Sequence, residues 1–249
     1  MLSLFLYLRM TLSALVFCIC ALPFYLGLLA VCAFLRRSPA IPVRRLIFRF
    51  GEFVLAGTLK GTIPVRFEDR SGDARPMERG IVVCNHRSAS DPFLMAALPM
   101  ARNCIQAVNR WPMRLPFFGH FARLAGYLDI TRMTYEEIRR RTADCVASGG
   151  VVIAFPEGTR SGSRRMGQFH SAFFRVAHDL TCPIFPVAIA GNERAPDRRF
   201  RFCAGRILMR RLPAIPGETA ARWSHRWLQN ETRSLLLRET EQMDKELQT

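Results

Sequence analysis

The chain has 249 residues, of which 49% are hydrophobic, and its formal net charge is +16. This length suits one domain of ordinary size with an accessory element, and the apolar content excludes a disordered chain. Nearly all of the positive charge is arginine, because Lys60 and Lys245 are the only lysines. Arginine pairs well with phosphate and carboxylate groups, so we expect an anionic partner: nucleic acid, an anionic membrane surface or a phosphorylated small molecule.

The N-terminal segment predicts a membrane anchor. No charged residue occurs from Thr11 to Leu35, and about 20 apolar residues suffice for a helix to cross the hydrocarbon core. Pro23 and Gly27 interrupt this stretch, which leaves both a kinked helix and a re-entrant hairpin open. The stretch is too long for the apolar part of a signal peptide. Arginines follow it while only Arg9 precedes it, so we expect the rest of the chain to face the cytoplasm at the cell membrane.

The next segment, from Val43 to Leu55, mixes arginines with large apolar residues. This pattern predicts a helix that lies in the membrane interface, with its guanidinium groups among anionic lipid headgroups. We therefore divide the chain into a membrane anchor with an interfacial helix (1–60) and a second domain (61–249).

The second domain alternates short apolar runs with segments of helical composition. Runs rich in Val and Ile predict strands at 80–84, 150–155 and 184–190, and helices are expected at 134–147, 168–177 and 218–247. Continuous apolar strands are typical of sheets buried on both faces. The pattern predicts an α/β fold with a mostly parallel sheet flanked by helices. The eight cysteines form no C-x-x-C pair, so we predict free thiols and no metal site.

A histidine and an aspartate follow the first of these strands. His86 falls in the expected loop, and Asp91 precedes Pro92 where a helix is predicted to begin. A carboxylate that binds one imidazole nitrogen fixes the tautomer and leaves the other nitrogen free to accept a proton. This is the arrangement that a general base needs, although the H-x4-D spacing alone is a weak signal.

Two further polar loops follow predicted strands. The strand at 150–155 leads into Glu157, Gly158, Thr159 and Arg160, and a short apolar piece ends at Arg132. Glycine allows close approach to a ligand, arginine binds phosphate with two N–H groups, and Glu157 is placed to orient that arginine or a substrate hydroxyl. Because parallel strands collect such loops at one edge, we expect the three loops to converge.

With these motifs the sequence resembles the glycerophospholipid acyltransferases typified by 1-acyl-glycerol-3-phosphate acyltransferase. The resemblance covers about residues 43–215. Asn85, His86 and Asp91 match the N-H-x4-D motif, and residues 155–161 match F-P-E-G-T-R-S in full; segments 185–189 and 115–119 look like two further family segments. The second motif departs from the family, since Asp129 and Thr131 replace its usual residues although Arg132 is kept, and His170 replaces a lysine. These changes put the acceptor in doubt more than the reaction.

The resemblance implies a reaction and its substrates. His86, held by Asp91, would deprotonate the hydroxyl of a lysophospholipid acceptor, and the oxygen would attack the thioester of acyl-coenzyme A or of an acyl carrier protein. Arg132 and Arg160, helped by Glu157, would hold the acceptor's phosphate. No cofactor or metal is implied. The expected acceptor is 1-acyl-glycerol-3-phosphate, with glycerol 3-phosphate or an amino-acid lysolipid left open.

Other functions fit the sequence less well. A serine lipase needs the motif G-x-S-x-G, and in the segment from Gly158 to Gly162 the serine stands one position too late for this motif. A noncatalytic membrane adaptor would not need His86, Asp91 and Glu157 together. A nucleic-acid binder would share the basic surplus, but the arginines gather beside the membrane segment and in phosphate-type loops, and no nucleic-acid partner is predicted.

Overall fold

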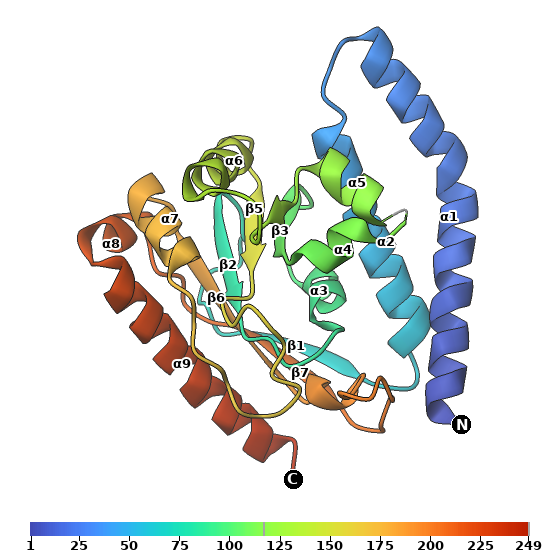
Figure 1. The fold of residues 1–249 in the computed structure, drawn as a ribbon. Coiled ribbons are helices and arrows are strands. Elements are labelled where there is room, and N and C mark those ends of the chain that lie inside the picture. Colours follow the sequence, from blue (N-terminus) through green and yellow to red (C-terminus); the bar gives the residue numbers. More distant parts are fainter. Residues whose placement is uncertain (117, 249) are drawn as a thin grey trace.

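The structure is a computed structural model that describes residues 1–116 and 118–248 (Figure 1). In these residues seven strands form one sheet, in the order β1-β7-β6-β2-β5-β3-β4. The strands are β1 (Val65–Asp69), β2 (Gly80–Cys84), β3 (Cys104–Val108), β4 (Leu128–Asp129), β5 (Val151–Ala154), β6 (Ile184–Ala190) and β7 (Ile207–Arg211).

The strand directions bring several loops to one edge of the sheet. Strand β2 pairs in parallel with β5 and β6, and β3 pairs in parallel with β5 and β4. Strand β7 is antiparallel to β6 and parallel to β1. The carboxyl ends of β2, β3, β4, β5 and β6 therefore share one edge, and the predicted mostly parallel sheet is confirmed.

The helices form a layer on each face of the sheet (Figure 1). They are α1 (Leu2–Phe34), α2 (Ala40–Leu59), α3 (Asp91–Leu94), α4 (Arg110–Arg114), α5 (Phe118–Ala125), α6 (Tyr135–Ala147), α7 (Ala172–Leu180), α8 (Gly217–Arg222) and α9 (His225–Glu246), with short 3-10 turns η1 (Met95–Ala97) and η2 (Asn192–Arg194). Side chains from α7 and α9 pack on one face of β2, β5 and β6, and side chains from α2 and α3 pack on the other. Every residue of β2 and β5 is buried as a result, which explains their unbroken apolar sequence.

Two predicted helices differ from the observed ones. The helix expected at 168–177 begins only at Ala172, because the N–H groups of Gly167 and His170 bind Glu157 and Pro156 instead of continuing a helix. The helix expected at 218–247 is divided into α8 and α9. Ser224 starts α9 by accepting a hydrogen bond from the N–H of Trp227 (3.2 Å).

The N-terminal segment is one continuous helix, so the re-entrant hairpin is excluded. Among the described residues, α1 alone is long and apolar enough to cross a membrane, and most of its side chains are exposed. It nevertheless runs along the domain: the Tyr7 hydroxyl donates to the Phe200 carbonyl (2.7 Å), and the Tyr25 hydroxyl contacts Nε2 of His120 (2.8 Å). Tyr7 and Tyr25 are about 27 Å apart along the helix axis at about 1.5 Å per residue, so the domain lies against most of α1.

Phe117, in the predicted segment 115–119, lies outside the described residues.

Candidate active site

The imidazole of His86 is fixed at the carboxyl end of β2. The side-chain amide of the preceding Asn85 exchanges two hydrogen bonds with the backbone of Ile189 in β6 (2.9 and 2.8 Å). The Nδ1–H of His86 donates to Oδ2 of Asp91 (2.7 Å), and the His86 side chain is 18% exposed. The contact expected from the H-x4-D spacing is therefore present. It leaves Nε2 of His86 as the ring nitrogen available to a substrate.

Asp91 is completely buried and bound on both oxygens. Its Oδ2 also accepts the backbone N–H groups of Arg87 (2.8 Å) and Ser88 (3.0 Å), and its Oδ1 accepts the side-chain amide of Asn192. Asp91 is the first residue of α3, and its side chain turns back into the β2–α3 loop. A buried carboxylate needs such donors to remain charged beside an imidazolium.

Glu157 joins the two motif loops. Its Oε1 accepts the backbone N–H of His86 (2.6 Å) and its Oε2 accepts that of Gly167 (2.7 Å). The side chain is buried, and this burial raises the pKa of Glu157 while the two N–H groups partly oppose the rise. Both oxygens of Glu157 thus accept backbone donors, and its role in orienting an arginine or a substrate hydroxyl stays a prediction.

The E-G-T-R loop lies directly against the His86 loop. The N–H of Ser161 donates to the His86 carbonyl (2.8 Å). Gly158 adopts φ +71°, in the region that favours glycine, and its carbonyl accepts the side-chain amide of Asn109 (2.9 Å). Thr159 is exposed at the tip of the loop. The loops after β2 and β5, two of the three predicted to converge, are therefore in contact, and the loop after β3 joins them through Asn109.

The two predicted phosphate ligands come from loops that follow different strands. Arg160 is half-buried, and its guanidinium lies over the ring of Phe200 in the β6–β7 connection (4.5 Å to the centroid). Arg132 is exposed after β4, and β5 and β3 lie between β4 and β2. At about 4.8 Å per strand, the end of β4 lies about 14 Å along the edge from the end of β2 and about 10 Å from the end of β5, which leads to Arg160. That both arginines hold one phosphate stays a prediction.

Sequence reasoning missed several residues at this edge. Partial desolvation lowers the pKa of Arg110, and the positive charges of Arg114 and Arg132 lower it further, so these three arginines form a group beyond β3 and β4. Asn192 was also missed, although a polar residue just after the buried strand β6 is a usable signal. In the described part of the chain, no three His, Cys, Asp or Glu side chains gather as a metal site would require.

Comparisons with known proteins agree with this geometry. A family model described as Acyltransferase matches residues 65–190. The lyso-ornithine lipid O-acyltransferase of Pseudomonas aeruginosa is 30% identical over 75% of this chain and 71% of its own. The 1-acyl-sn-glycerol-3-phosphate acyltransferase of the same organism is 24% identical over 62% of this chain, and that of Cocos nucifera is 31% identical over 47%. The matches span 61% and 39% of those two relatives.

A solved structure extends the similarity to nearly the whole chain. The crystal structure of the 1-acyl-sn-glycerophosphate (LPA) acyltransferase PlsC from Thermotoga maritima has a TM-score of 0.71 to this fold and is 20% identical. The alignment covers 97% of this chain and 94% of that one, so the fold is the same. With the family model and the relative that is 30% identical, this shows that the chain belongs to the glycerophospholipid acyltransferase family.

Proposed function

We propose that this protein is an O-acyltransferase that moves a fatty acyl group from an acyl thioester to the free hydroxyl of a lysophospholipid, with 1-acyl-glycerol-3-phosphate as the first candidate acceptor and phosphatidic acid as the product. One observation carries the proposal: the His86 imidazole is held by buried Asp91, and the backbone of His86 is hydrogen-bonded to the E-G-T-R loop. The family to which the chain belongs supports the same reaction.

The reaction needs only one proton carrier. Nε2 of His86 takes the proton of the acceptor hydroxyl as its oxygen attacks the thioester carbonyl, and Asp91 stabilises the imidazolium that forms. Backbone N–H groups of these loops would stabilise the oxyanion of the tetrahedral intermediate. The C–S bond then breaks, an ester forms, and His86 returns its proton to the thiolate. Neither a covalent acyl-enzyme nor a cofactor is required.

We assign the acceptor's phosphate to Arg160 and the E-G-T-R loop. In a lysophosphatidate the phosphate and the free hydroxyl are separated by a few bonds, so the phosphate ligand must lie close to His86. Arg160 belongs to the loop that hydrogen-bonds to His86, whereas Arg132 follows β4, which lies about 14 Å from β2 along the sheet edge. In coenzyme A and in the acyl carrier protein, a long pantetheine arm separates the thioester from the phosphates. We assign those phosphates to the group formed by Arg110, Arg114 and Arg132.

The membrane anchor fits a lipid acceptor. The Tyr7 hydroxyl of α1 donates to the carbonyl of Phe200, whose ring lies under Arg160. The beginning of the apolar helix is thus joined to the phosphate loop, and a lipid held beside α1 has a short path to the site. We propose that the domain lies at the cytoplasmic surface of the cell membrane, where arginines contact anionic lipids.

A second acceptor class is favoured by particular observations. The relative that acts on lyso-ornithine lipid, by its name, is 30% identical over 75% of this chain. In the altered second motif, Asp129 is buried and accepts hydrogen bonds from Thr131, where the family usually carries other residues. An amino-acid lysolipid, whose headgroup contains an ammonium group that a carboxylate can bind, is therefore the alternative acceptor.

The test is a matrix of acceptors and donors. Purified protein in detergent is incubated with lysophosphatidate, glycerol 3-phosphate or lyso-ornithine lipid, each with acyl-coenzyme A or with acyl carrier protein, and products are identified by mass spectrometry. We expect phosphatidic acid as the main product, and preferred formation of diacylated ornithine lipid would assign the alternative acceptor. Release of fatty acid without acceptor, at the rate of transfer, would indicate a hydrolase, and no turnover in any mixture would indicate a noncatalytic adaptor.

A further inference from the structure

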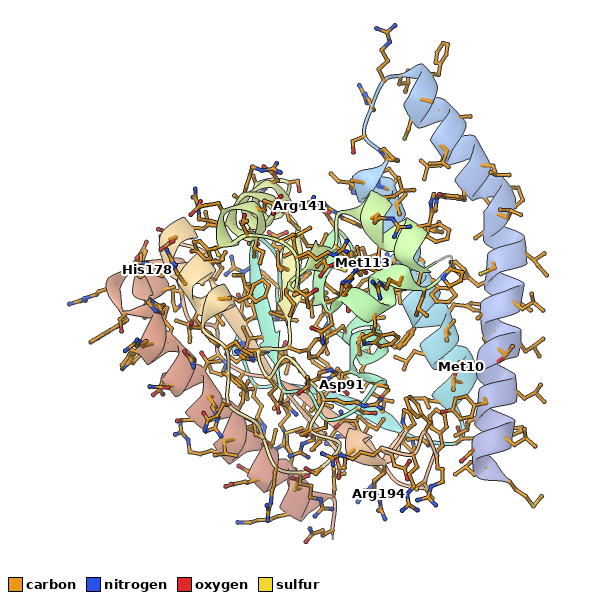
Figure 2. All side chains as sticks on the ribbon, in the orientation of Figure 1. Met10, Asp91, Met113, Arg141, His178 and Arg194 are labelled. Atoms are coloured by element: carbon orange, nitrogen blue, oxygen red, sulfur yellow. The ribbon has the colours of Figure 1, made fainter. Side chains whose placement is uncertain are left out.

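The residue next to His86 is tied to the other end of the chain. Arg87 is 2% exposed, and its guanidinium forms two hydrogen bonds of 2.8 Å with the two carboxylate oxygens of Asp244. Asp244 lies in the last turn of α9, and its carboxylate is 11% exposed. Glu193 adds a longer contact to the same guanidinium (3.5 Å). Figure 2 labels Asp91 among the side chains of the site, and Figure 1, in the same orientation, shows the C-terminal end of α9 in the same lower part of the view.

The backbone of Arg87 holds both halves of the site. Its N–H donates to Oδ2 of Asp91 (2.8 Å), and its carbonyl accepts the N–H of Gly162, just beyond the E-G-T-R motif (3.0 Å). A shift of Arg87 would therefore move the Asp91 carboxylate relative to the imidazole and also the phosphate loop. The two shortest bonds of the Arg87 guanidinium go to Asp244, and Glu193 and the Arg164 carbonyl (3.2 Å) accept longer ones.

Stability alone is a weak explanation for this ion pair. Replacing a buried ion pair by apolar groups of similar volume is often neutral or stabilising, so the pair is not needed to hold α9 on the sheet. The same helix has a second contact of this kind: Glu239 binds Arg210 (3.0 Å), which is 1% exposed. Arg210 lies in β7, and its guanidinium binds Glu68, Glu239 and Glu246, which all lie outside the His86 loop. The two ion pairs therefore differ mainly in the part of the protein that their arginine contacts.

We propose that Asp244 is a positioning residue for acyl transfer: through the buried Arg87 it fixes the loop in which His86 and Asp91 meet. The C-terminal helix then contributes to catalysis from outside the sequence motifs. This inference rests on the proposed roles of His86 and Asp91.

The experiment compares Asp244→Asn with Glu239→Gln as a matched control in the full-length protein. Each change removes one carboxylate charge from α9 opposite a buried arginine. We expect both to lower the thermal unfolding temperature, and only Asp244→Asn to lower kcat, by about 10- to 100-fold, with little change in KM for either substrate. A double variant, Arg87→Met with Asp244→Leu, should regain stability but not kcat.

A second measurement does not depend on turnover. The Nδ1–H proton of His86, identified by its loss in His86→Ala, should give a downfield NMR signal because it is bound to a carboxylate. We expect Asp244→Asn to shift or broaden this signal, and Glu239→Gln to leave it unchanged. If that response occurs but no acceptor is acylated, the proposed function is wrong and the positioning contact stands. Wild-type kcat and an unchanged signal in Asp244→Asn, or equal kcat losses in both single variants, would overturn the inference.

Discussion

Replacing Asp91 by asparagine separates charge from geometry at the site. The carboxylate accepts three N–H groups on Oδ2, from His86, Arg87 and Ser88, and one on Oδ1, from Asn192. An amide oxygen in the place of Oδ2 keeps the first three bonds and the same imidazole tautomer. The new NH2 group faces Asn192, whose Oδ1 is buried and has no partner. A flip of the Asn192 amide turns that oxygen toward the new donor, so the fold should tolerate Asp91→Asn.

The catalytic cost follows from the lost attraction between Asp91 and the imidazolium. At a separation of about 4 Å and an effective dielectric constant of about 20, two unit charges attract by about 4 kcal/mol. Each 1.4 kcal/mol or so corresponds to about a factor of ten, so the upper bound is about 10³-fold. Since a general base contributes about 10²–10⁴-fold in total, we expect kcat of Asp91→Asn to fall by about 10²–10³-fold.

The assay measures initial rates of acyl transfer to lysophosphatidate, together with thermal unfolding by circular dichroism. Asp179→Asn is the matched control, because Asp179 also binds a histidine (His178, 3.0 Å) but is far from the motif loops in sequence and lies on α7. We expect this control to keep its activity. A folded Asp91→Asn protein with the wild-type rate would refute the charge-based role of Asp91.

Other predictions concern the remaining motif residues. Burial raises the pKa of Glu157 in the folded state, so the folded protein binds the proton more tightly than the unfolded chain does. The stability of the wild type relative to Glu157→Gln should therefore be greatest at low pH and decrease as the pH rises through the raised pKa. Denaturant titrations at several pH values would measure this difference. Gly158→Ala should lower the free energy of unfolding by about 1–2 kcal/mol, because φ is +71° and the new Cβ would lie 3.1 Å from the His170 ring. Chemical denaturation measures this change, and an unchanged midpoint would contradict it. Arg160→Ala should raise KM for lysophosphatidate by about 10-fold or more and leave KM for acyl-coenzyme A unchanged. Arg132→Ala should instead raise KM for acyl-coenzyme A and leave KM for lysophosphatidate unchanged. The opposite pattern in steady-state kinetics would exchange the two assignments.

The sequence predicts the centre of this fold well because its strands are buried on both faces. The apolar runs that form β2, β5 and β6 are unambiguous, and the H-x4-D spacing places a carboxylate within reach of His86. Both signals are local. They depend on a few neighbouring residues and on the general rule that parallel strands end at one edge.

What the sequence alone could not predict depends on long-range arrangement. Strand order places β3 between β5 and β4, so the loops that carry Arg160 and Arg132 follow strands that are not neighbours. The bonds of Glu157 to two backbone N–H groups were not predictable, because every residue but proline carries such a group and the sequence does not mark which ones are used. Asp244 joins Arg87 across 157 positions, and no spacing rule connects a loop to a distant helix.

The most direct test of the proposed chemistry is the initial rate of transfer by the wild type, His86→Ala and His178→Ala, with product and free thiol both quantified. His178 is the control, since it also binds an aspartate but lies on α7. We predict one free thiol for each diacylated lipid in the wild type and in His178→Ala, and a rate about 10²–10⁴-fold lower in His86→Ala. Equal rates in a folded His86→Ala protein would contradict the assignment of His86 as the base.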